Sequence, residues 1–427
     1  MSRVALLLAF LFTFAARATE GERPAEPRVT TVEKDYRARR QAALAAQWME
    51  VKLPFETPAQ FLARLIDTAR EGDSRATAAL GWEFHQRGDS GRAKIWLGRS
   101  AERENPFAAY LLGLLETKES ATPAVPPEID WMQRAADAGF ADAQFEIALR
   151  HVLGKGVPAD AVAGREWYGR AAAQNYAPAL CNLATMEIQG QGGAVDFPAA
   201  EEHFRQAAAS GFPQGHYGLG EVCRLQNRLA DSIPPYELAA EAGLVEADFW
   251  LGCLALQLPG QPRDEKKAAL HFIRAAAGGH FMARIIAADI QRRGAGVDPD
   301  PEAAGRLEPE LAKLTDPQLM ATIGGLFLEG KLVERDPSNA LRYFRRAALQ
   351  GHPAAQRWAG ALLATGEAGE RDLEEAYQWL WLAARGGEAD AEPIFQAVLR
   401  AMDGPQIVHA ARRAESFLPA PPASAAK

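Results

Sequence analysis

A five-residue phrase that returns at a nearly constant interval constrains this chain more than any other feature. The phrase has two small residues, two variable residues and then Gly or Asn. Full copies begin at Ala135, Ala171, Ala207, Ala239, Ala275, Ala347 and Ala383, and degenerate copies begin at Thr68, Ser100 and Leu311. Successive copies are 32, 35 or 36 residues apart. A period of this length indicates stacked supersecondary units rather than separate globular domains.

Each copy lies at the end of a predicted helix, which we call helix B. A bulky ring stands four residues before the phrase at Trp96, Trp131, Trp167, Tyr343 and Trp379, while His203 and His271 take this place in two units. Residues four apart share a helix face, so the ring and the alanine face the same neighbour. We expect the two histidines to be packed in the core and the glycine to end the helix.

A second predicted helix, helix A, follows each phrase. In it a small residue precedes an aliphatic one by four positions, as in Ala143 and Ile147, and it ends at a Gly-rich loop such as residues 154–157. Glycines there suit a turn with positive φ. No run of alternating β-branched residues predicts a sheet. The sequence therefore predicts an all-α fold, a superhelical α-solenoid of about nine helix-hairpin repeats.

An acidic residue precedes helix B at one fixed offset. It is Asp160, Asp196, Asp264, Asp300, Asp336 or Asp372, with Ser232 in the equivalent place of one unit. A row of catalytic or metal-binding carboxylates is one interpretation, and helix N-caps are the other. The serine favours the caps, because serine caps a helix but does not replace a carboxylate base.

The same residues resemble the Sel-one-like repeat, a longer relative of the tetratricopeptide repeat. Residues 143–148 with Gly154, Gly156, Val157 and Asp160 reproduce most of that motif, and residues 376–379 with 383–387 reproduce the rest. The similarity covers residues 73–392. It is weak at residues 100–129, where residues 122–127 carry three prolines, and around Leu311. The chain lacks the paired cysteines of the family's cysteine-rich extracellular branch.

The resemblance implies an interaction scaffold rather than one activity. By likeness to tetratricopeptide arrays, helix A lines a concave face that offers groove candidates to a partner's peptide or helix. These candidates are Tyr110, Phe145, Tyr217, Glu221, Arg224, Phe249, Asp289 and Arg292. If the aromatic rings among these candidates are exposed, they are expected to bind a segment of the partner. The alternative is that the rings belong to the hydrophobic core. A further hypothesis is that Arg224 and Arg292 select an acidic segment.

The two ends of the chain differ from the array. Residues 1–18 combine a basic start, an apolar run and a small-x-small site, so we expect a signal peptide cut after Ala18 and a periplasmic or secreted protein. Residues 19–58 are expected to form a linker and one helix over 33–51. The repeats occupy 59–390, a capping hairpin 391–418 and a disordered tail 419–427. No later segment is long and apolar enough to predict a membrane span.

Charge and cysteine content limit the partners. The net charge of −8 falls near −10 once Arg3 and Arg17 are removed, which disfavours nucleic acid. We expect a monomer that binds a protein. Cys181 and Cys253 are predicted to be buried apolar groups, and a Cys223–Cys253 bridge stays open.

Catalytic chemistry finds no support in the residue pattern. No paired C-x-x-C or H-E-x-x-H motif is present, and no acid pair, nucleophile with base, or metal cluster breaks the repeat. His280 and His352 occupy one repeat slot, so we interpret them as repeat features. We therefore expect a non-enzymatic scaffold without cofactors. Two alternatives stay open: a glycan-binding component of cell-wall assembly or polysaccharide export with weak hydrolase activity, and a regulator that tethers a membrane partner.

Overall fold

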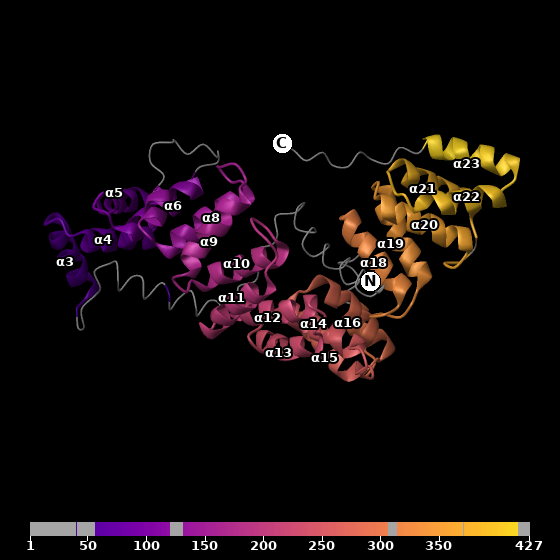
Figure 1. Cartoon of the computed structure of the whole chain (residues 1–427), viewed down its shortest axis with the longest axis horizontal. Coiled ribbons are helices and arrows are strands. Elements are labelled where there is room, and N and C mark those ends of the chain that lie inside the picture. Colours follow the sequence, from indigo (N-terminus) through magenta and orange to yellow (C-terminus); the bar gives the residue numbers. More distant parts are fainter. Residues whose placement is uncertain (1–39, 41–55, 120–130, 306–313, 370, 417–427) are drawn as a thin grey trace. The chain divides into compact units, whose positions relative to one another are not determined.

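The computed structural model describes residues 40, 56–119, 131–305, 314–369 and 371–416. Within these residues the regular elements are helices, with no strand, so the predicted all-α class is confirmed (Figure 1). The predicted signal peptide, the linker and helix before residue 56 apart from Arg40, the copy at Leu311 and the tail lie outside the described residues. No described helix has the length and apolar character needed to cross a bilayer.

The described helices alternate between the two predicted types. The A helices are α4 (Ser74–Gln86), α6 (Pro106–Glu119), α8 (Ala141–Leu153), α10 (Ala177–Gln189), α12 (Pro213–Leu225), α14 (Val245–Gln257), α16 (Phe281–Arg293), α18 (Pro317–Glu329) and α20 (Pro353–Thr365). The B helices are α3 (Pro58–Arg70), α5 (Ser90–Ala101), α7 (Trp131–Asp137), α9 (Ala161–Ala172), α11 (Phe197–Ala209), α13 (Ile233–Glu241), α15 (Glu265–Gly278), α19 (Pro337–Leu349) and α21 (Leu373–Arg385). A 3-10 turn, η1 (Ala230–Ser232), precedes α13, and α22 (Ala391–Ala401) and α23 (Gly404–Ser416) follow α21.

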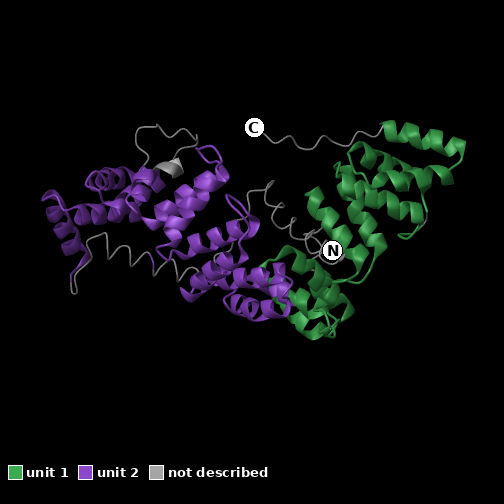
Figure 2. Cartoon of the chain, in the orientation of Figure 1, with its two compact units in different colours: residues 1–28, 252–427 green, residues 29–251 purple. Residues whose placement is uncertain are grey.

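The described helices fall into two compact units, one that ends at Leu251 and one that begins at Gly252 (Figure 2). In each unit, helices that follow one another in the chain pack side by side, as α8 does on α9 and α20 on α21. This is the helix-hairpin stack of a solenoid, in which each hairpin contacts its neighbours along the chain.

The recurring phrase forms the C-terminal cap of helix B. Its last residue has a positive φ, which is 87° at Gly139, 56° at Asn175 and 100° at Gly279. The amide of the following residue donates to the carbonyl of the first phrase residue, as from His280 to Ala275 at 2.9 Å. This six-to-one bond defines the Schellman motif, which explains both the length of the phrase and its glycine.

One aspartate closes each of several hairpins at two points. Asp336 donates its amide to the carbonyl of Phe327 in α18 at 2.9 Å, and its carboxylate accepts from the amide of Asn339 in α19 at 2.9 Å. We call this pair of bonds the aspartate clasp. Asp160, Asp196, Asp264, Asp300 and Asp372 form it too, each with a carbonyl nine residues earlier. The N-cap interpretation of these acids is confirmed.

Ser232 does not follow this pattern, so its assignment as an equivalent cap is wrong. Its hydroxyl donates to the carbonyl of Leu229 at 2.7 Å and makes no bond to α13. Ser232 has an αR backbone and ends the 3-10 turn, so its side chain points back along the chain rather than onto the first amides of the helix.

The core of each hairpin centres on the residue directly after the ring that the sequence singled out. This residue is at most 4% exposed at Leu97, Met132, Tyr168, Phe204, Tyr236, Phe272, Phe344 and Leu380. The ring before it is buried at Trp131, Tyr343 and Trp379 and half-buried at Trp96 and Trp167. His271 is buried as predicted, whereas His203 is half-buried and bonds through Nδ1 to Glu187 Oε2 at 2.9 Å.

A small residue of helix A lies directly against this buried side chain. A Cβ added at Gly220 would lie 2.5 Å from a ring carbon of Tyr236, and one added at Gly324 would lie 2.8 Å from Phe344. Ala148 and Ala184 are fully buried in the cluster that contains Tyr168 and Phe204. We call these contacts the hairpin seam, and they hold the two helices of a hairpin at close range.

Two adjacent glycines of α18 allow a matched test of the seam. Gly324→Ala places a methyl group against Phe344, which is 1% exposed and has no room to move. We expect a loss of about 1–3 kcal/mol of unfolding free energy from overpacking. Gly325→Ala meets nothing within 4 Å, so helix propensity should stabilise it by about 0.5–1 kcal/mol. Urea unfolding of both variants measures the difference, and equal midpoints would contradict the seam.

Two histidines cap A helices through a ring nitrogen. His280 Nδ1 accepts from the amide of Ala283 and His352 Nδ1 from the amide of Ala355, both at 3.2 Å. His352 Nε2 lies 2.9 Å from Gln318 Oε1, which fixes the neutral tautomer with its proton on Nε2. Burial lowers the pKa of His280 to about 4 and also lowers the pKa of His352. The shared slot is therefore a repeat feature.

These caps predict an acid-sensitive contribution to stability. In the folded chain the pKa of each histidine lies below its unfolded value of about 6.5. The neutral rings therefore stabilise the fold above that pH, and this contribution is lost as the pH falls toward 4. The carboxylates of Glu388 and Asp316 partly offset this effect at His352. The double variant His280→Asn with His352→Asn keeps side-chain caps that do not titrate. Melting temperatures between pH 7 and pH 4 should fall less for this variant, and parallel curves would refute the assignment.

Candidate partner-binding face

The four predicted groove rings occupy one position of helix A, the fifth residue of α6, α8, α12 and α14. Tyr110, Phe145 and Tyr217 are half-buried, and Phe249 is buried. We call these four residues the ring row. The partial exposure of the first three contrasts with the rings at the hairpin seam of helix B, such as Tyr168 and Phe272, which are almost wholly buried. The ring row therefore lies between the two alternatives, partly in the core and partly at the surface.

Each half-buried ring of the ring row contacts another aromatic side chain. The ring centroid of Tyr110 lies 5.2 Å from that of Phe140, and Phe145 lies 5.4 Å from Tyr168 and 5.5 Å from Tyr176. These are tilted and edge-to-face contacts, which hold the rings in fixed orientations. Burial raises the pKa of Tyr110, and the carboxylates of Asp142 and Glu146 raise it further.

Tyr217 belongs to a cluster of rings and charges on α12, α13 and α14. Its centroid lies 5.7 Å from that of Tyr236, and burial raises its pKa well above the ordinary value. Glu221 and Arg224 are both 7% exposed, and Arg224 Nη2 lies 3.0 Å from Glu221 Oε2. The Tyr236 hydroxyl also donates to Glu221.

The guanidinium of Arg224 is thus engaged within the chain. Its Cζ lies 4.6 Å from the ring centroid of Trp250, and its charge is balanced by Glu221. Selection of an acidic segment by Arg224 requires an accessible positive charge, and the structure gives this side chain a buried carboxylate instead. Contact of the other candidates with a partner stays a prediction.

The two remaining candidates lie on α16. Asp289 is 5% exposed and accepts from Arg293 Nε at 2.8 Å and from the amide of Glu334 at 3.0 Å. Asp289 therefore ties α16 to the loop after α18. Arg292 is exposed.

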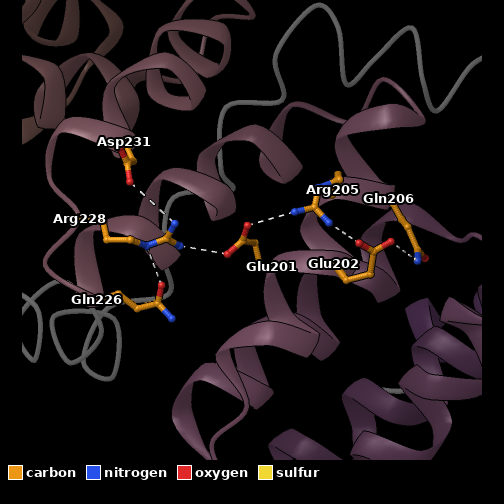
Figure 3. Close-up of polar contacts among 7 residues, drawn as sticks. All are labelled: Glu201, Glu202, Arg205, Gln206, Gln226, Arg228 and Asp231. Atoms are coloured by element: carbon orange, nitrogen blue, oxygen red, sulfur yellow. Dashed lines mark hydrogen bonds and ion pairs between the residues drawn. The ribbon is translucent and has the colours of Figure 1, made fainter.

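A network of exposed charges that the sequence analysis missed joins α11 to the loop after α12. Figure 3 shows Arg228 pointing toward Glu201, which also faces Arg205. The Arg228–Glu201 distance is 3.0 Å, and Arg228 Nε lies 2.9 Å from Gln226 Oε1. Exposed ion pairs contribute about 0–1 kcal/mol each, so this network adds little to stability. No periodic signal marks it, because Arg228 lies in a loop without an aspartate clasp.

Asp142 and Tyr176 also escaped the sequence analysis. Asp142, at the start of α8, binds Arg40, and Tyr176 precedes α10. An acidic residue in the first turn of a helix is expected from its favourable interaction with the helix dipole, so its presence does not indicate that it also binds another side chain.

The described residues offer no grouping of three or more His, Cys, Asp or Glu side chains that would hold a metal ion. Cys181, Cys223 and Cys253 are buried and form no disulfide, so the Cys223–Cys253 bridge is absent. Burial raises the pKa of the Cys181 and Cys223 thiols, which makes them poor nucleophiles.

The family profile of the Sel1 repeat matches residues 129–140, 141–176, 177–212, 245–280, 283–307, 320–352 and 353–388. These segments make up half of the chain, which therefore belongs to the Sel1 repeat family, as the resemblance predicted. Proteins of this family generally mediate protein–protein interactions and are typically non-enzymatic scaffolds. No curated protein matches the chain.

Solved structures with Sel1-type repeats are similar to it. A Sel1 repeat protein from Oxalobacter formigenes is 26% identical, with 56% of this chain and 98% of that chain covered and a TM-score of 0.48. The protective antigen c5321 of uropathogenic Escherichia coli strains, which displays an SLR fold, is 20% identical, with 83% and 94% covered and a TM-score of 0.38.

The buried ion pair on α12 predicts a strong asymmetry between single and double substitutions. Glu221→Gln leaves the Arg224 charge buried without its carboxylate and should cost about 3–5 kcal/mol of unfolding free energy. Glu221→Gln combined with Arg224→Met removes both charges and should recover most of that loss. Urea unfolding measures both, and a double variant no more stable than the single one would refute the pairing.

Proposed function

We propose that the chain is a scaffold of the cell envelope or extracellular space that binds a segment of another protein along the ring row. The observation that carries this proposal is the partial exposure of Tyr110, Phe145 and Tyr217 at one helix position. The three rings stand at one position of α6, α8 and α12, with the buried Cys181 at the same position of α10, and such repeated positions suit an extended or helical segment.

The division of the rings supports this proposal. The rings of helix B that lie at the hairpin seam are buried inside their hairpin, as is Tyr168, which is 2% exposed. Rings on helix A are not needed for the same contacts, because a small residue of that helix fills the seam. Aromatic side chains that are rigid and half-exposed are the commonest anchors of protein interfaces.

The export part of the proposal rests on residues 1–18, whose basic start, apolar run and small residues are typical of a signal peptide. Six aspartate clasps account for the periodic carboxylates by structure alone, which supports a binding role over a catalytic one.

Cross-linking in intact cells, followed by capture of a C-terminally tagged full chain, tests the proposal. Phe145→Ala and Tyr217→Ala should each lower the yield of the captured protein about tenfold or more, since an interface anchor contributes about 2 kcal/mol. Leu238→Ala is the matched control, because Leu238 is 49% exposed on a B helix and should leave the yield unchanged. An exported chain should begin at Thr19 when its N-terminus is sequenced.

Equal capture by all three variants would dispose of the ring row as the binding face. A polysaccharide that co-purifies in place of a protein, and is lost in the same two variants, would favour the glycan-binding alternative.

A further inference from the structure

A guanidinium group lies against α8, in the unit that ends at Leu251, close to Tyr110 and Phe145 of the ring row. Arg40 Nη2 lies 2.5 Å from Asp142 Oδ2, and Arg40 Nε lies 3.2 Å from both carboxylate oxygens. The Cζ atom of Arg40 lies 4.2 Å from the ring centroid of Tyr176. Two features distinguish the recognition of arginine from that of lysine. One is a carboxylate that accepts from two guanidinium nitrogens, and the other is an aromatic ring stacked against the plane of the guanidinium.

The walls of this site belong to the repeat array and do not depend on Arg40. Asp142 is the second residue of α8 and is 8% exposed. Tyr176 directly precedes α10, and its ring meets that of Phe145 edge to face at 5.5 Å. Phe145 in turn packs on the buried Tyr168. The carboxylate and the ring are therefore held in place by the hairpins themselves.

The electrostatic character of the site suits a cation. Asp142 and Glu146 lie close enough that each raises the pKa of Tyr110, and the Arg40 guanidinium lowers it. Burial raises the pKa of Glu146, and the Asp142 carboxylate raises it further, against Arg150 and Lys155. The Asp142 carboxylate therefore adds to the negative potential at Glu146 and Tyr110, and the Arg40 guanidinium pairs with Asp142.

Arg40 is an occupant that the array does not need. It precedes Asp142 by 102 residues and comes from outside the repeats. Its side chain is 24% exposed, against 11% for Asp142, so solvent reaches the cation more than its acceptor. Arg40 takes no part in a hairpin seam.

From this geometry we infer that the Asp142–Tyr176 site recognises an arginine side chain on the partner segment, and that Arg40 competes for the same place. The inference rests on the proposed function and names the chemistry of its partner: a segment that carries arginine and lies along the ring row next to Phe145. Arg40 then acts as an internal competitor that lowers the affinity of the site for the partner's arginine.

Calorimetric titration of the full chain with acetyl-Gly-Arg-Gly-amide tests this inference. Arg40→Ala should bind the probe about tenfold more tightly than the parent chain, as expected when a competitor that fills nine sites in ten is removed. The same variant should discriminate against acetyl-Gly-Lys-Gly-amide. Arg205→Ala is the matched control, because Arg205 forms exposed ion pairs on α11 and should leave the affinity unchanged.

Adding Asp142→Asn, or separately Tyr176→Leu, to Arg40→Ala should abolish the gain, with the melting temperature showing that each variant is folded. Equal binding of the arginine and lysine probes, or no gain on removal of Arg40, would overturn the inference. Those results leave the ring row untouched, since capture of a protein that depends on Tyr217 but not on Asp142 supports the scaffold and rejects only the arginine site.

Discussion

The hairpin seam is the contact on which the rest of this structure depends. A small residue of helix A meets a fully buried side chain of helix B, as Gly324 meets Phe344 and Gly220 meets Tyr236. Close approach of two helices needs one partner without a bulky side chain, and dense packing then leaves no room for change. The Schellman caps and the aspartate clasps fix where each helix begins and ends, so that the two sides of the seam meet in register at every repeat.

The seam also determines which aromatic side chains are available to another molecule. The side chains that directly follow the helix-B ring are buried by it, whereas Tyr110, Phe145 and Tyr217 on helix A lie three residues before the small seam residue of their helix and keep part of their surface. Tyr110, Phe145 and Tyr217 thus differ from Tyr168 or Phe272 in location rather than in chemistry. In the hairpins that begin with α6, α8 and α12, this division links the packing of the repeat to its proposed use as a binding surface.

Local rules predicted much of the fold, and long-range contacts account for what they missed. The period, the glycine caps and the six aspartates are set within a few residues of sequence, and all were predictable. The deepest core position was placed one residue too early, because the conspicuous ring drew the assignment although the next residue, about 100° further round the helix, points into the hairpin. Arg224 was read as an exposed charge because its burial depends on Tyr236 and Trp250, which belong to other helices. The Arg40–Asp142 contact joins residues too far apart for any periodic pattern to reveal it.

The hairpin of α12 and α13 closes without an aspartate clasp. A 3-10 turn and Ser232 stand where the hairpins on either side, α10–α11 and α14–α15, have a clasping aspartate, and the unit is four residues shorter than its 36-residue neighbours. Stability in a repeat array is a sum of local and nearest-neighbour terms, so the weakest closure determines where cooperativity ends. Partial denaturation of this chain should therefore begin at an internal fracture near residue 230, with folded segments surviving on either side, rather than by fraying from the termini inward.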